Sequence, residues 1–178
     1  MQNIDPIAPL ATAYGLLGES LHASGLVADD WSELPRRQLP RDISSVDLDA
    51  VALLTRVRRY LQSYPAGRVA SAAGKGLDAV RALPAGENTG NYILTAAHLL
   101  AMWAAEHHGP TAAMLSTHAA RIIDDVGRSV REVAGEATAR QSYRIADNLY
   151  RAMTARPILD DAIRDAWTRR WAKQKEAA

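Results

Sequence analysis

The sequence predicts an all-α protein, a bundle of six or seven helices that forms a single domain over residues 1–178. Apolar residues recur three and four positions apart along most of the chain, which is the spacing of one face of an α-helix. Alanine, the strongest helix former, supplies 34 of the 178 residues. No segment has the alternating, Val-, Ile- and Thr-rich pattern of a strand, so a sheet is not expected.

The first helix is defined by an apolar stripe, and an irregular connector follows it. The stripe comprises Ile7, Leu10, Tyr14, Leu17 and Leu21. Gly25 is suited to end this helix, because glycine tolerates the backbone conformation found at helix ends. Residues 28–43 show no helical period, and prolines interrupt the tract 34–41. We therefore expect an extended arm or loop at 28–43.

Two helices are expected between residues 44 and 83. The earlier one opens with the capping box Ser44-x-x-Asp47 and ends at Pro65. Its apolar stripe comprises Ala50, Leu53, Leu54, Val57, Tyr60, Leu61 and Tyr64. The later helix, over about 68–83, contains many alanines together with Gly74 and Gly76. Such small residues predict a close approach to another helix.

The second half of the chain predicts a central helix and its neighbours. The helix near residues 90–108, with Thr89 as its N-cap, is apolar on nearly every face, so we expect it to lie buried at the centre. Gly109 and the proline after it separate this helix from one over about 111–133. The residues of that helix expected to point inward are Leu115, Ala119, Ile122, Val126 and Val133. A sixth helix should run to about residue 155, and Pro157 begins a seventh.

The net charge of +1 conceals strong local charges. Residues 1–50 carry a net charge of −5 and residues 51–85 a net charge of +5. Coding bias can produce an excess of Arg over Lys, but it does not explain this distribution. Two basic helices in sequence predict a face that binds phosphate groups, which guanidinium groups contact in a bidentate manner. The candidate nucleic-acid-binding residues are Arg56, Arg58, Arg59, Arg68, Lys75 and Arg81, with a second stripe of Arg140, Arg144 and Arg151.

Alternatives to this interpretation remain open. A charged face is also expected on any solvated surface, or where an acidic protein binds. Tyr60 and Tyr64 either stack on unpaired bases or complete the core stripe of their helix. In the arm, the candidate partner contacts, for a neighbouring subunit or for phosphates, are Trp31, Arg36, Arg37 and Arg41. Packing of this segment on the protein's own surface is the alternative.

The sequence contains none of the common catalytic motifs. It has no His-Glu-x-x-His, no P-loop and no Gly-x-Ser-x-Gly elbow. The absence of Cys excludes disulfides and thiolate metal sites. His118 and Asp125 share a helix face, and they could form a metal site together with His98. However, no residue stands at the spacing that would mark it as the third ligand of such a site. We expect no enzyme activity, no metal and no cofactor, and interpret His98 as a hydrogen-bonded core residue.

The expected location is the cytoplasm, without a membrane partner. The first residues lack the basic and apolar regions of a signal peptide. The most apolar stretch, residues 92–105, is short of the roughly 20 residues needed to span a bilayer.

In length, helical character and the basic stretch between Arg56 and Arg81, the chain resembles the helical small subunits of CRISPR ribonucleoprotein effectors, which serve antiviral defence. That resemblance implies several copies along a guide-RNA backbone, contacting protein subunits and nucleic acid without cleaving either. The expected function is a non-catalytic subunit of such a nucleoprotein assembly. It would contact RNA or DNA backbone through the arginine-rich face, and other protein subunits or self-copies through the arm and the acidic N-terminal part. The alternative is a helical protein–protein adaptor or regulator with no nucleic-acid role.

Overall fold

The computed structural model describes residues 6–27, 41–83 and 90–154. Within them, the chain forms only helices: α1 (Ala8–Ala23), α2 (Ser45–Leu61), α3 (Ala66–Arg81), α4 (Tyr92–Glu106), α5 (Pro110–Ala134) and α6 (Glu136–Thr154). The predicted all-α class is confirmed. The predicted seventh helix, Thr89 and residues 28–40 of the expected arm lie outside the described residues.

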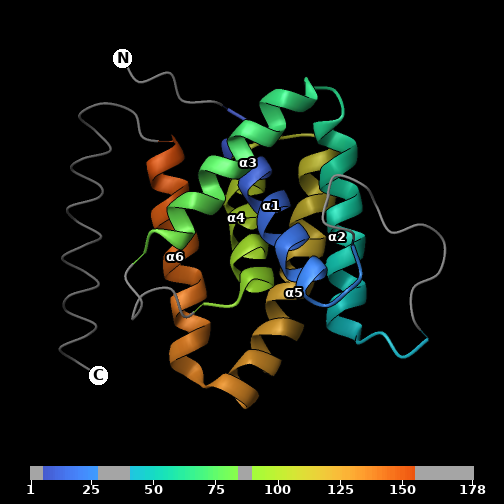
Figure 1. Cartoon of the computed structure of the whole chain (residues 1–178), viewed down its shortest axis with the longest axis vertical. Coiled ribbons are helices and arrows are strands. Elements are labelled where there is room, and N and C mark those ends of the chain that lie inside the picture. Colours follow the sequence, from blue (N-terminus) through green and yellow to red (C-terminus); the bar gives the residue numbers. More distant parts are fainter. Residues whose placement is uncertain (1–5, 28–40, 84–89, 155–178) are drawn as a thin grey trace.

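Two helices, rather than one, form the centre of the bundle (Figure 1). Helix α4 packs against α1, α5 and α6, as expected of the apolar fourth helix. Helix α1 packs against α2, α3 and α4, and every residue from Pro9 to Gly18 is buried. The apolar stripe predicted for α1 is buried as expected, but the residues between its members from Ala11 to Gly18 are buried too. None of them is charged and all but Leu16 are small, so neighbouring helices cover α1 on more sides than a single stripe requires.

Small residues bring α1 and α3 into close contact. A Cβ atom added at Gly76 of α3 would lie 2.0 Å from the Thr12 Oγ1 atom of α1. Ala11 of α1 clusters with Ala72 and Ala73 of α3. The close approach predicted from the small residues of the third helix is therefore confirmed at Gly76. Gly74 of the same helix has no atom of a neighbouring element within 4 Å of such a Cβ.

Capping side chains and glycines determine where several helices begin and end. The Ser44 hydroxyl accepts a hydrogen bond of 3.1 Å from the Asp47 backbone N–H, as the capping box predicted. Helix α4 begins at Tyr92 rather than residue 90, because the Asn91 side chain caps it by accepting from the Leu94 N–H at 3.0 Å. Gly109 and Gly135, on either side of α5, have positive φ angles of 103° and 95°, which favour glycine.

The inward face predicted for α5 is correct except at its end. Leu115, Ala119, Ile122 and Val126 are buried, whereas Val133 is 86% exposed. Val130 takes the last inward position instead. Helix α5 has 25 residues and α4 has 15, so the final turn of α5 extends beyond the helix on which it packs, and all of its side chains are exposed.

Candidate nucleic-acid interface

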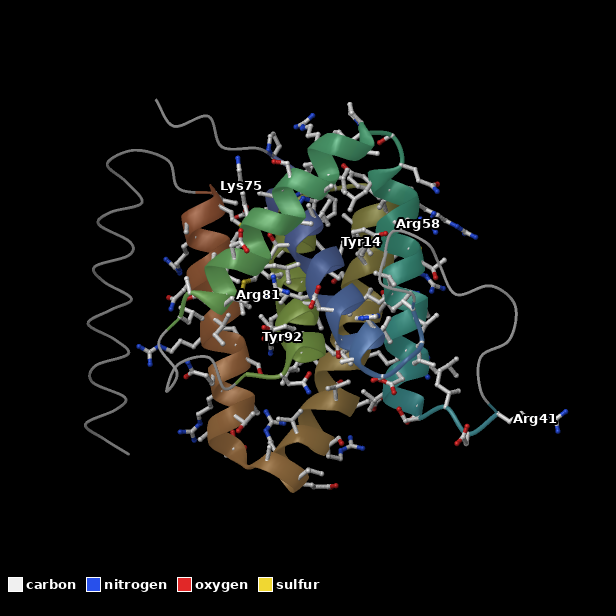
Figure 2. The ribbon with its side chains drawn as sticks, in the orientation of Figure 1. Tyr14, Arg41, Arg58, Lys75, Arg81 and Tyr92 are labelled. Carbon is white, nitrogen blue, oxygen red and sulfur yellow. The ribbon has the colours of Figure 1, made fainter. Side chains whose placement is uncertain are left out.

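The structure divides the predicted basic face of the second and third helices between two sides of the bundle. Helices α2 and α3 follow one another in the chain and both pack against α1, but α2 also packs against α5 and α3 also packs against α6. Arg56 and Arg59 of α2 lie beside α5, whereas Arg68 and Lys75 of α3 lie beside α6. Figure 2 shows Lys75 and Arg58 far apart on the molecule. Lys75 is therefore separate from the α2 arginines, whereas Arg68 is near both sets, because it lines a hollow between α3 and α6 and its guanidinium also stands over Tyr64.

The residues beside α5 line a furrow between α2 and the first half of α5, which we call the α2–α5 furrow. It consists of two adjoining hollows that share Ala52 and Arg56. The Tyr60 hollow, of about 650 Å³, is lined by residues including Thr55, Arg56, Arg59, Tyr60, Thr111 and Met114. The His118 hollow, of about 390 Å³, is lined by residues including Asp49, Val51, Arg56, His118, Arg121 and Ile122. From Leu48 to Ser63 the furrow follows α2 for about 20 Å, at 1.5 Å per residue.

The local sequence of α2 explains why two of its arginines face the furrow and a third does not. The apolar stripe of α2, which includes Leu53, Val57 and Leu61, is buried in the core. Arg56 and Arg59 are three positions apart and therefore lie on one side of this stripe. Arg58 is about 160° from Arg56 around the helix axis. It points outward from α2 in Figure 2 and lines neither hollow.

Tyr60, which lines the hollow named after it, belongs to an aromatic cluster that extends into the bundle. The Tyr60 ring lies edge-on to Trp103 of α4 with 5.5 Å between ring centroids, and 6.1 Å from the ring of Tyr64. The His107 ring stacks on Trp103, with 4.1 Å between ring centroids. The Arg68 guanidinium stands over the Tyr64 ring at 5.1 Å. Tyr60 and Tyr64 are only partly buried, so they belong to the core and also present ring surface to solvent.

Cationic groups predominate in the furrow. Within the described chain, no carboxylate forms an ion pair with Arg56 or Arg59, although Arg56 donates to the Ala52 carbonyl at 3.3 Å. Arg121 forms long ion pairs with Asp49, at 3.9 Å, and with Asp125, at 3.8 Å. Burial lowers the pKa of His118 below its usual range, Arg56 and Arg121 lower it further, and Asp49 opposes them.

Several other arginines predicted to bind nucleic acid are held in ion pairs within the chain. Arg81 pairs with Glu19 of α1 at 3.0 Å, and more distantly with Asp78. On α6, Arg140 pairs with Glu136 at 3.6 Å and Arg151 pairs with Asp147 at 3.1 Å. The second predicted stripe, which also contains Arg144, lies on α6 and lines neither hollow of the furrow.

Of the candidate arm residues, only Arg41 lies within the described residues. Its side chain is exposed just before α2, and Figure 2 shows it extending away from the bundle. Trp31, Arg36 and Arg37 lie outside the described residues, so their predicted partner contacts stay predictions.

A third hollow lies on the other side of the bundle, between α3 and α6. Its volume is about 380 Å³, and the apolar residues that line it include Ala72, Ala79, Leu149 and Met153. Arg68 and Lys75 supply its positive charge. This α3–α6 groove therefore combines a small, apolar floor with a cationic margin.

The histidines do not converge on a metal site in the part of the chain that is described. No group of three His, Cys, Asp or Glu side chains with metal-binding geometry occurs there. His98 packs edge-on against Tyr143 of α6 at 5.2 Å, rather than toward His118. Burial, with a smaller contribution from Arg131, lowers the pKa of His98 to about 4, so its imidazole is neutral near pH 7. No described residue hydrogen-bonds this ring, in contrast to the expectation from the sequence.

Two basic residues of the furrow were not predicted to bind nucleic acid. Arg121 and His118 lie more than 60 positions after Arg56 in the chain, and nothing in their local spacing connects them to it. His118 was considered only as a metal ligand. The packing of α2 on α5 brings these residues together, and that pairing has no signal in one sequence.

Comparisons with known proteins give no match to any family model, curated protein or solved structure. Among the described helices, none is both long enough and apolar enough to cross a membrane.

Proposed function

We propose that this protein is a non-catalytic helical subunit of a nucleoprotein assembly, and that it binds a strand of RNA or DNA along the α2–α5 furrow. The observation that carries the proposal is the lining of the Tyr60 hollow, where Arg56 and Arg59 stand beside a partly exposed tyrosine ring. Arginine contacts phosphate in a bidentate manner, and an aromatic ring stacks on an unpaired base. An unpaired strand presents both groups, so the proposal favours single-stranded nucleic acid.

The size and charge of the furrow are consistent with this ligand. Its length of about 20 Å accommodates several nucleotides of a strand, and the two arginines without carboxylate partners in the described chain are available to phosphate. Binding to Arg81 or Arg151 would instead require breaking an internal ion pair. The phosphate contacts of the proposal therefore rest on Arg56 and Arg59.

The assembly part of the proposal rests on the resemblance to CRISPR small subunits in length, helical character and the basic stretch 56–81. A subunit of this kind contributes contacts rather than chemistry. Copurification from the native host, followed by mass spectrometry and nucleic-acid extraction, tests this part directly. A preparation that contains neither nucleic acid nor other subunits would contradict it.

Binding of the purified chain to single-stranded RNA and DNA across a salt series tests the furrow. The double variant Arg56→Glu/Arg59→Glu should bind more weakly, and its slope of log K against log salt should be shallower by about 0.7 for each phosphate that is no longer bound. Arg58→Glu is the matched control, because it changes the same charge on the same helix outside the furrow. If Arg58→Glu weakens binding as much per charge, net charge rather than the furrow controls binding.

A second candidate function, a helical adaptor, is favoured by the α3–α6 groove. Its apolar floor and its cations Arg68 and Lys75 suit an amphipathic helix of a partner protein that carries acidic residues beside its apolar face. Binding of nucleic acid that is unchanged by the furrow variants, together with protein capture that is abolished in Lys75→Glu, would favour the adaptor over the proposal.

A further inference from the structure

The His118 hollow brings three basic side chains together from two helices. Arg56 comes from α2, and His118 and Arg121 come from α5. Their charges act on one another, since both arginines lower the pKa of His118. Two carboxylates counter them: Asp49 of α2 and Asp125 of α5, each of which pairs with Arg121 at nearly 4 Å. The ion pairs are long and Arg121 is 67% exposed, so an incoming anion can compete for it.

We propose that Arg56, His118 and Arg121 form a binding subsite for one phosphate group of the strand, and that His118 binds this phosphate as imidazolium. The inference rests on the proposed function and specifies one contact within the same furrow. The proton on His118 comes from solvent at the moment of binding, and no covalent bond forms or breaks. Arg56 lines both hollows, so it would join this phosphate to the nucleotide in the Tyr60 hollow.

The empty and the phosphate-occupied hollow favour opposite protonation states of His118. In the free protein, burial and two neighbouring cations favour neutral imidazole, and Asp49 offsets them only in part. A bound phosphate adds negative charge beside the ring, which favours the imidazolium form and raises the pKa of His118. Linkage then requires proton uptake on binding.

This linkage predicts how affinity depends on pH. The phosphate-bound pKa of His118 lies above the free value, so the extra affinity is fully present below the free pKa. It is lost as pH rises through the bound pKa. Between the two values, affinity should fall by at most about tenfold for each pH unit, which is the limit for one proton.

Titration of the His118 imidazole by NMR, in the full chain with and without inorganic phosphate, tests the subsite directly. Five histidines are present, and His118→Gln identifies the signal. The subsite predicts that phosphate raises the pKa of His118. His108 lines neither hollow, so its signal is the internal control and should not move when phosphate is added at fixed pH. An unchanged His118 titration at saturating phosphate or oligonucleotide would overturn the subsite.

Oligonucleotide binding across pH then separates the subsite from the proposed function. His118→Gln should flatten the pH dependence that the wild type and His108→Gln share. Asp49→Asn should tighten binding at fixed pH, because it removes a carboxylate that competes for Arg121. If binding depends on Arg56 and Arg59 but keeps its pH profile in His118→Gln, the subsite is wrong and the furrow stands. If phosphate raises the pKa of His118 while no strand binds, the subsite stands and the nucleic-acid function is wrong.

Discussion

Replacement of Gly76 by alanine should destabilise the bundle, even though alanine is the better helix former. The added Cβ atom would lie 2.0 Å from Thr12 Oγ1, 2.6 Å from its Cγ2 and 2.7 Å from its Cβ. Rotation of the Thr12 side chain relieves at most one of the first two contacts, because its two heavy substituents fill two of the three staggered positions. It does not change the third contact, because the Thr12 Cβ position is fixed by the α1 backbone. Reaching an ordinary separation of about 3.4 Å therefore requires α1 and α3 to move apart by roughly 0.7 Å, and α1 is buried on nearly all sides.

The magnitude follows from two opposing effects. Overpacking of this kind costs about 1–3 kcal/mol, and a clash that the backbone must relieve belongs at the upper end. The change from glycine to alanine within a helix returns up to about 1 kcal/mol. We therefore expect Gly76→Ala to lower the free energy of unfolding by about 2 kcal/mol.

Gly74→Ala is the matched control, since it lies on the same helix with no neighbouring atom within 4 Å of its added Cβ. It should stabilise the protein by about 0.5–1 kcal/mol. Urea denaturation followed by circular dichroism measures both variants. The double variant Gly76→Ala/Thr12→Gly also removes the Thr12 Cβ. It should therefore regain part of the stability that Gly76→Ala loses through the clash. Equal stability of the two alanine variants would refute the close packing of α1 on α3.

Two further predictions concern α4. Asn91→Ala should lower the free energy of unfolding by about 1 kcal/mol, because the Leu94 N–H loses its cap. Asn148→Ala, on the exposed face of α6, is the control and should change it little. Equal effects of the two substitutions would argue against the cap. His98 has a folded-state pKa of about 4, below its unfolded value, so its contribution is present above about pH 6.5 and is lost as pH falls toward 4. Denaturation across this pH range should show the free energy of unfolding falling by an amount approaching about 3 kcal/mol. His98→Gln should reduce this fall, and His108→Gln should not. An unchanged profile in His98→Gln would contradict a buried neutral imidazole.

The charge pattern of the sequence acquires a different meaning in the folded chain. From the sequence, the acidic N-terminal part was expected to contact other subunits or self-copies. In the structure, Glu19 pairs with Arg81 of the same chain and Asp49 pairs with Arg121. Part of the polarity is thus neutralised within one molecule. Of the remaining cations of segment 51–85, Arg56 and Arg59 line the α2–α5 furrow, whereas Arg68 and Lys75 line the α3–α6 groove.

The helices of this protein and their burial could be predicted from the sequence, because local spacing carries that information. The stripe of α2, its cap at Ser44 and the glycines around α5 are each specified within a few residues of the chain. The cap at Asn91 shows the limit of this reasoning, since the Asn91 N–H is also held by Ser142 of α6 at 2.8 Å. A contact between residues 51 positions apart helps to set where α4 begins.

By itself, the sequence determined the fold class, most helix boundaries and which side of each helix is apolar, since all of these depend on neighbours along the chain. Only the tertiary structure decided which arginines share a surface. Arg58 and Arg59 are adjacent in sequence but face different surroundings, because a step of one residue turns a helix by about 100°. Arg56 and Arg121 are distant in sequence but line one hollow, because α2 packs on α5. A helix face follows from spacing, but the helix that lies opposite it depends on how all the faces are buried together.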